Sequence, residues 1–135
     1  MIPKKIYCIS CDCENEFGLR LVKKHFDIRG VSIQVEIVEA YCKNCNNPVF
    51  VYDVEKENQK IITDTYKKKV GLLTSFEIEQ IRNRFGLSQK QLSNIIKCGE
   101  KNIARYENGA IQDRTINLLL ILVRDHPEYF KLKEK

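Results

Sequence analysis

Cysteines are the residues of this 135-residue chain whose type and spacing most clearly indicate chemistry. Four of the six form two pairs, Cys8-x-x-Cys11 and Cys42-x-x-Cys45. A separation of two residues lets one tight turn present both sulfurs to a Zn²⁺ ion, and two such turns complete a tetrahedron of thiolates. The spacing therefore predicts one structural zinc ion per chain, with the ligands Cys8, Cys11, Cys42 and Cys45.

The alternative is that these four cysteines are reduced thiols buried as small apolar side chains. Polar neighbours disfavour that alternative; they are Ser10, Asp12, Lys43 and Asn44. A catalytic zinc site is also disfavoured, because such sites keep one position for water and usually include histidine or carboxylate ligands. Cys13 is too close to Cys11 for a usual ligand pair and is interpreted as a spare thiol, while His25 is expected on the surface of a strand or turn.

A second set of residues, from Leu87 to Gly109, has the pattern of a DNA-contacting element. It predicts two short helices joined by a tight turn at Cys98-Gly99, with Leu92, Ile96 and Ile103 facing inward. The outward face of the second helix carries Glu100, Lys101, Asn102 and Arg105. The first residues of such a helix reach base edges in the major groove, where Arg or Lys can bond the acceptors of guanine. An ordinary helical hairpin with a polar face would show the same periodicity, so the pattern alone leaves both interpretations open.

Strands are expected to position the cysteines. Apolar Val31, Ile33, Val35 and Ile37 alternate with polar residues, which predicts a half-buried antiparallel strand. Residues 17–22 predict an earlier strand, residues 48–52 a short later one, and Arg29-Gly30 a turn. The first unit is therefore predicted to be a small sheet with a cysteine pair at each end of its main hairpin.

Helices are expected to position the DNA-contacting residues. The patterns Thr74-x-x-Glu77 and Ser88-x-x-Gln91 are capping boxes, Asp113 can cap a longer apolar helix, and Pro127 suits the first turn of a last one. The fold class is α+β: a small zinc-bound β domain over residues 1–69, ending in a linker helix at about 55–69, and an all-α domain of five helices over 70–135. We expect the run Lys67-Lys68-Lys69 to form a solvated face.

The composition excludes several classes of protein. A hydrophobic fraction of 43%, a charged fraction of 30% and a net charge of +5 are typical of a globular protein. The longest apolar run, residues 118–123, is far below the ~18–20 residues of a membrane span. We expect a cytoplasmic protein without a signal peptide or membrane partner. We also expect no enzyme, because no nucleophile–base pair or phosphate-binding glycine loop is present and His25 and His126 lie at opposite ends of the chain.

Two motifs together carry a family resemblance. Residues 87–109 resemble the Cro/CI-like (XRE) helix-turn-helix in their Ser-Gln opening, buried Leu and Ile and Arg-Tyr-Glu-Asn-Gly close. With the two cysteine pairs and the intervening strands, nearly the whole chain resembles the YgiT/MqsA-type antitoxin family. The other matching segments are residues 26–30, 39–42, 71–74 and 109–113.

The resemblance implies a homodimeric zinc-binding antitoxin of a type II toxin–antitoxin system. Its N-terminal domain would bind a protein toxin, and its C-terminal domain would repress its own operon at a palindromic double-stranded operator. By position, Lys101 and Arg105 would read bases. The residues that would hold phosphates are Gln89, Asn102 and Asn108. Family cysteine pairs often continue with Gly where this chain has Asp12 and Asn46.

The alternative function is a stand-alone or mobile-element transcriptional regulator without a toxin, which would share all the DNA chemistry.

The expected dimer interface is the helix from Asp113 to Asp125, whose sequence is apolar on nearly all sides. A surface helix normally shows one apolar stripe, so the surplus face needs a cover. A two-fold partner would cover it and would set two recognition helices about one DNA turn apart. The alternative cover is the linker helix or the terminal segment 129–132.

Overall fold

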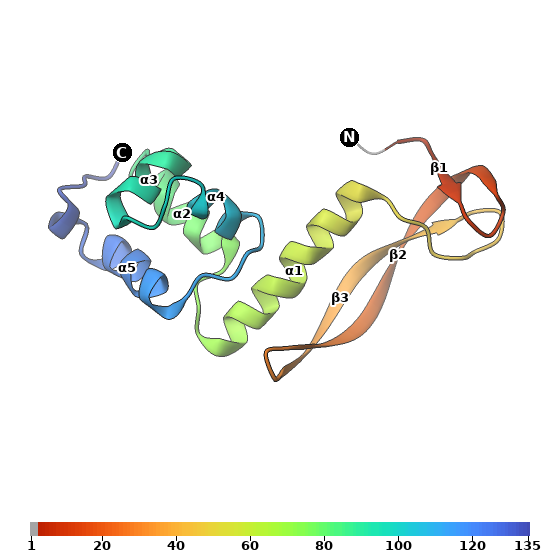
Figure 1. The fold of residues 1–135 in the computed structure, drawn as a ribbon, viewed down its shortest axis with the longest axis horizontal. Helices are drawn as coiled ribbons and strands as arrows, with labels where there is room; N and C mark the ends of the chain where they lie inside the picture. The colour runs from red at the N-terminus through yellow and green to blue at the C-terminus, as the bar shows by residue number, and fades with distance from the viewer. Residues whose placement is uncertain (1–2) are drawn as a thin grey trace. The chain divides into compact units, whose positions relative to one another are not determined.

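The structure of the chain is a computed structural model that describes residues 3–135. The chain divides into two compact units, Met1–Ile62 and Thr63–Lys135, so the division falls within the helix α1 (Tyr52–Val70). Figure 1 labels the helices and strands along the chain. None of the helices in the described part of the chain has both the length and the apolar character of a membrane span.

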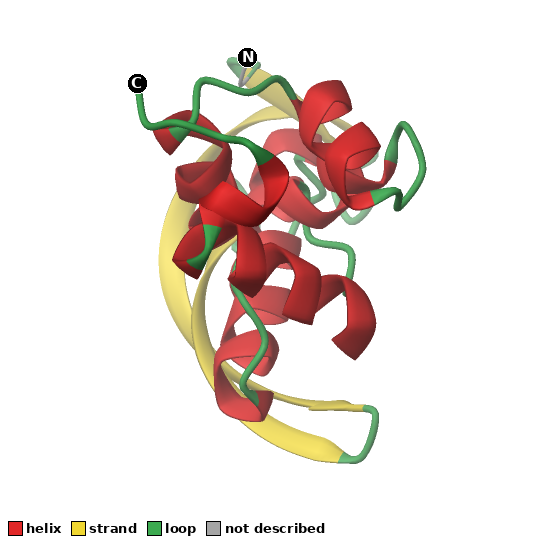
Figure 2. Cartoon of the chain, turned by 90° about the vertical axis from the view of Figure 1, so that its left-hand side faces the viewer, coloured by secondary structure: helices red, strands yellow, loops and turns green. Residues whose placement is uncertain are grey.

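The first unit is built on three antiparallel strands in the order β1 (Lys5–Cys8), β2 (Cys13–Ile28) and β3 (Val31–Cys42). The long β2–β3 hairpin is the curved yellow ribbon of Figure 2. It closes through the two-residue turn Arg29-Gly30, whose φ angles of 49° and 81° are both positive. Two left-handed residues in a two-residue loop match the twist of the flanking strands, so this turn fixes the register of the hairpin.

The prediction of a short strand over residues 48–52 is wrong. The segment makes one isolated bridge, Tyr41 with Pro48, and Tyr52 already begins α1. Acidic Asp53 and Glu55 stand in the first turn of α1, where the helix dipole favours negative charge. Strand propensity over so few residues is weak, and helix initiation at residue 52 outweighs it.

The apolar side of β3 changes face at Ile37–Val38, although the pairing with β2 stays regular across Ile37 and Val38. Ile33, Val35 and Ile37 are buried on one face of the strand. Val38 and Ala40 lie on the other face, where Val51 and Val54 join them in a small core. At the changeover, Asn58 of α1 pairs with the backbone of Val38, accepting from its N–H at 3.2 Å and donating to its C=O at 2.7 Å.

The second unit contains the helices expected after residue 70. They are α2 (Ser75–Arg84), α3 (Gln89–Ile96), α4 (Asn102–Glu107), α5 (Arg114–Asp125) and the 3₁₀ helix η1 (Pro127–Phe130). Both predicted capping boxes form, and Asp113 caps α5 by accepting from the N–H of Ile116 at 2.8 Å. Ile78, Leu92, Ile103, Leu120 and Val123 are fully buried and form the centre of the core. The predicted α+β fold is therefore confirmed.

One expectation about the second unit is wrong. Lys67 is fully buried rather than solvated, whereas its neighbours Lys68 and Lys69 are exposed. The Lys67 Nζ donates to the backbone carbonyl of Tyr106 at 3.4 Å. The reason is helical phase: Thr63, one turn earlier on α1, is also buried and shares this side of the helix with Lys67.

Candidate functional site

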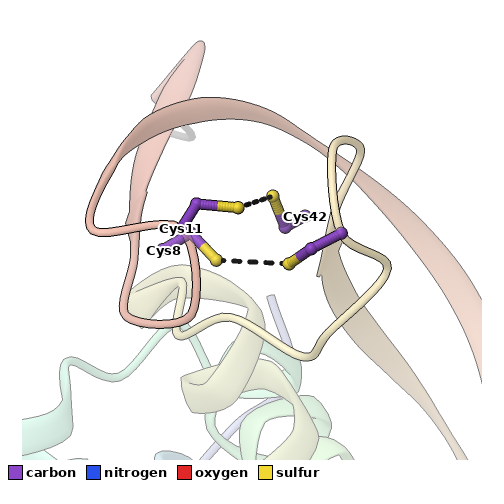
Figure 3. Close-up of side chains that lie close together, drawn as sticks. Cys8, Cys11 and Cys42 are labelled. Atoms are coloured by element: carbon purple, nitrogen blue, oxygen red, sulfur yellow. Dashed lines mark hydrogen bonds between the residues drawn. The ribbon is translucent and has the colours of Figure 1, made fainter.

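The two cysteine pairs come together in the first unit (Figure 3). Cys8 ends β1, Cys11 lies in the turn before β2, Cys42 ends β3 and Cys45 follows it. The four sulfurs all lie within 4.8 Å of one another, with 3.5 Å between Cys8 and Cys45 and 3.9 Å between Cys11 and Cys42. Four thiolates at ~2.3 Å from one tetrahedral ion would be about 3.8 Å apart. The cluster can therefore hold a metal ion with little rearrangement.

Each cysteine pair lies in a tight turn that ends in a left-handed residue. The N–H of Asp12 donates to the C=O of Cys8, and that of Asn46 to the C=O of Cys42, both at 2.8 Å. Asp12 and Asn46 have φ angles of 56° and 66°. Glycine is the usual residue for this conformation, but Asn and Asp tolerate it best among the other residues. The departures from glycine thus keep the turn shape that brings the sulfurs together.

Nearby amides favour thiolate at one side of the cluster. Burial opposes ionisation of Cys42, but the backbone N–H groups of Cys45 and Asn44 outweigh it and lower the pKa of Cys42 to about 6. Asn44 also donates to the Cys11 sulfur at 3.3 Å, yet the adjacent cysteines and burial raise the pKa of Cys11 to about 12. Four thiolates in this space repel one another, and a divalent cation would remove that repulsion.

The remaining cysteines lie outside this cluster. Cys13 is exposed, with its sulfur 3.8 Å from Oδ1 of Asn15. Cys98 is half-buried and packs against the core of the second unit, and burial raises the pKa of its thiol. His25 is exposed on β2. The spare thiol and the surface histidine stand where the sequence predicted them.

The second candidate site is the outer face of α4. Lys97 and Gly99, with φ angles of 59° and 99°, turn the chain between α3 and α4. The N–H of Ile103 then donates to Oγ of Ser93 at 3.3 Å, which holds the start of α4 against α3. Lys101 and Arg105 are both exposed, one just before α4 and one on its outer side. Two cations, Lys101 and Arg105, are thus exposed on a short helix whose opposite side is held by α3.

The three residues expected at phosphates have different surroundings. Asn102 donates to the carbonyl of Cys98 and accepts from Arg105 Nη1 at 3.2 Å. Gln89 donates to Oε1 of Glu107 at 3.2 Å. Asn108 is exposed immediately after α4. Asn102 and Gln89 thus also orient other side chains, in addition to any role on DNA.

An ion pair that the sequence analysis missed joins α4 to α2. Glu107 is buried and accepts from Arg82 Nε at 2.8 Å and from Nη2 at 3.0 Å. Arg82 also donates to the carbonyl of Leu87 at 3.1 Å. The hydrogen bond to Glu107 raises the pKa of Arg82 above the ordinary value of an arginine. The signal was available: Glu107 lies four residues after inward-facing Ile103, so both share one side of α4.

Comparison with known proteins gives one curated relative and one family. A protein of Plasmodium falciparum (isolate 3D7) described as "Uncharacterized membrane protein" is 24% identical over 113 residues, which is 80% of this chain. The chain spans about 3% of that protein's length, so the similarity carries no argument about function. The family described as "Antitoxin component of bacterial toxin-antitoxin system, MqsA" matches residues 7–134. The match includes both cysteine pairs and all the helices from α1 to η1.

Proposed function

The chain belongs to the MqsA antitoxin family, and on that premise we propose that it neutralises a protein toxin and represses its own operon by sequence-specific DNA binding. The observation that supports this most is a single family match extending over both the cysteine cluster and the α3–α4 element. The first unit would bind the toxin, and the second would bind the operator. Neither role requires catalysis by the chain itself.

Zinc is the metal proposed for the cluster. The donor set is four cysteine sulfurs, and four thiolates in a tetrahedron suit Zn²⁺ and leave no position for a water molecule. The ion would be structural: Cys8 and Cys11 would fix the β1–β2 turn to Cys42 and Cys45 at the end of β3. A sheet this small buries little apolar area, so the metal would supply much of its folding free energy.

DNA is proposed to meet the outer face of α4. The Arg105 guanidinium group could bond both acceptors of a guanine in the major groove, and Lys101 could reach the same edge or the next phosphate. Gln89, Asn102 and Asn108 would contact the DNA backbone, with Gln89 at the N-terminus of α3, where backbone N–H groups favour a phosphate.

A second copy of the chain is proposed to cover the outer side of α5. Leu120 and Val123 face the core, but Leu118 is 58% exposed and Leu122, one turn on, is only half-buried. Phe76, at the start of α2, is 62% exposed. A two-fold contact through this side would remove apolar surface from water and place two α4 helices on successive turns of a palindromic operator.

One experiment tests the two halves of this proposal separately. The chain is co-expressed with the product of the adjoining gene, and its binding to duplex DNA from its own promoter is measured by footprinting. We expect a stable complex with the gene product and protection of a palindrome. If the palindrome is protected but no complex forms with the gene product, the chain is a regulator without a toxin. If the complex forms but no DNA is protected, the chain is not a repressor.

A further inference from the structure

The recognition helix α4 is only six residues long, so the surrounding structure must hold it in place. Isolated helices shorter than about 12 residues are marginal in water. Ser93 anchors the start of α4 through the N–H of Ile103, and Arg82 anchors its end through Glu107. A third anchor comes from a residue that precedes α2 in the chain.

That residue is Lys67, near the end of α1. Its side chain is fully buried, and its Nζ donates to the carbonyl of Tyr106, the residue next to Arg105. The N–H of Gly109 donates to the same carbonyl at 3.3 Å. The last carbonyls of a helix carry partial negative charge, so an ammonium group is favourable at this position.

The burial of Lys67 opposes the charged form of its side chain. Burial lowers the pKa of Lys67 to about 8, although the negative charge of Asp64 acts in the opposite direction. Asp64 also accepts from the N–H of Ser75 at 2.8 Å and from its hydroxyl at 2.5 Å. An apolar side chain of similar length, such as methionine, would fill the space without the cost of dehydrating a charge. Since methionine would serve packing alone, the hydrogen bond to the Tyr106 carbonyl is the feature that distinguishes a lysine at this position.

We propose that Lys67 is a positioning residue for DNA recognition, whose ammonium group fixes the C-terminal end of α4 and so sets where Arg105 meets the DNA. This inference rests on the proposed DNA binding. It assigns part of the recognition apparatus to α1, which precedes the helix-turn-helix in the chain.

Three variants of the full chain separate this role from stability and from net charge. Lys67→Met removes the buried ammonium group at similar volume, and Lys67→Arg keeps a cation there. Lys68→Met is the matched control, because it removes the same formal charge from an exposed position on the same helix. The probe is duplex DNA from the promoter of the protein's own gene, with a shuffled duplex of equal length as the competitor.

We expect Lys67→Met to melt no lower than the parent chain but to bind the promoter about tenfold less tightly, the equivalent of one lost hydrogen bond to a charged group. Lys67→Arg should recover part of the affinity, and Lys68→Met should stay close to the parent. In amide spectra, the signal of Gly109, which shares the Tyr106 carbonyl with Lys67, should move in Lys67→Met and not in Lys68→Met.

Equal promoter affinity and selectivity in Lys67→Met and the parent would overturn the inference and leave the proposed function intact. An equal loss in Lys68→Met, or a loss that accompanied a lower melting temperature, would overturn it too. If the parent itself did not prefer the promoter over the shuffled duplex, the proposed function would fail and the inference with it. If Lys67→Met did not fold, Lys67→Gln, which keeps a neutral donor, would be judged by the same comparisons.

Discussion

Arg82 and Glu107 form a two-bond ion pair, at 2.8 and 3.0 Å, that joins α2 to the helix carrying Arg105. Glu107 is almost completely buried, and Gln89 donates a third hydrogen bond to it. Removing one partner of such a pair leaves an uncompensated charge, which costs far more than removing both. The pair therefore fixes α4 on the side opposite the exposed Lys101 and Arg105.

The first prediction concerns this pair. Arg82→Met should lower the free energy of unfolding by about 3 kcal/mol, because Glu107 would stay buried without its cation. Urea denaturation of the full chain measures the change. The double variant Arg82→Met/Glu107→Leu should recover much of the loss. If it were less stable than Arg82→Met, the buried charge would not be the cause.

The second prediction concerns the metal. Chelation, or Cys42→Ser, should unfold the first unit and leave α2–α5 folded, because the small sheet depends on the metal for its stability. Metal analysis should find one zinc ion per chain, and amide spectra should lose only the signals of the first unit. Cys13→Ser is the control. The exposed thiol of Cys13 lies outside the cluster, so this variant should keep the zinc ion. Well under one zinc ion per chain in protein purified without chelator would contradict the prediction.

The third prediction concerns base reading. Arg105→Ala should cost about 1–3 kcal/mol per half-site and abolish the preference for the palindrome, because a bidentate base contact is lost. Gln89→Ala should weaken binding to all sequences alike and make the salt dependence shallower, as expected for a lost phosphate contact. Competition footprinting at several salt concentrations distinguishes the two. Unchanged selectivity in Arg105→Ala would mean that α4 does not read the operator.

The fourth prediction concerns self-association through α5. Leu118→Glu should convert the dimer to a monomer at tens of micromolar, because a carboxylate would be placed in an apolar contact. Sedimentation of the full chain measures the mass. Leu21→Glu is the matched control, since Leu21 is 67% exposed on β2 in the other unit and should not affect the mass. A parent chain that sediments as a monomer would exclude this interface.

The fifth prediction concerns Lys67 and pH. Its native pKa of about 8 lies below the unfolded value of 10.5, so between these values the unfolded chain binds more protons and stability gains as pH rises. The stability advantage of Lys67→Met over the parent should therefore be largest below pH 8 and shrink by up to about 3 kcal/mol as pH increases toward 10.5. Lys68→Met, compared with the parent in the same way, should show no such trend.

Local signals were sufficient to predict much of this fold. Ser88 and Gln91 form the capping box that their spacing indicates, because a capping box involves only four consecutive positions. The cysteine spacing likewise predicted the cluster, since each pair needs one tight turn and the hairpin joins the two. The two-residue turn at Arg29-Gly30 follows the same local rules.

The features that the sequence analysis missed depend on what packs against each segment. Val49 and Phe50 have strand propensity, but the segment that contains them forms only a bridge before α1 begins. Lys67 belongs to a run of three lysines, and only the packing of α1 in the second unit shows which of them is buried. The consecutive apolar residues Ile37 and Val38 interrupt the alternation of β3, but the sequence does not show that Asn58 of α1 pairs with the backbone at this point.

The pairing of Asn58 with Val38 also affects how the sheet behaves in a crowded solution. β3 is an edge strand, and an open edge attracts the strands of other molecules and starts aggregation. The Asn58 side chain offers one donor and one acceptor to the Val38 backbone, as a neighbouring strand would, so at this point the edge is already occupied. This carboxamide closes the edge of the twelve-residue strand at Val38, and two residues further on the N–H of Val49 closes it again by donating to the C=O of Ala40 at 2.9 Å.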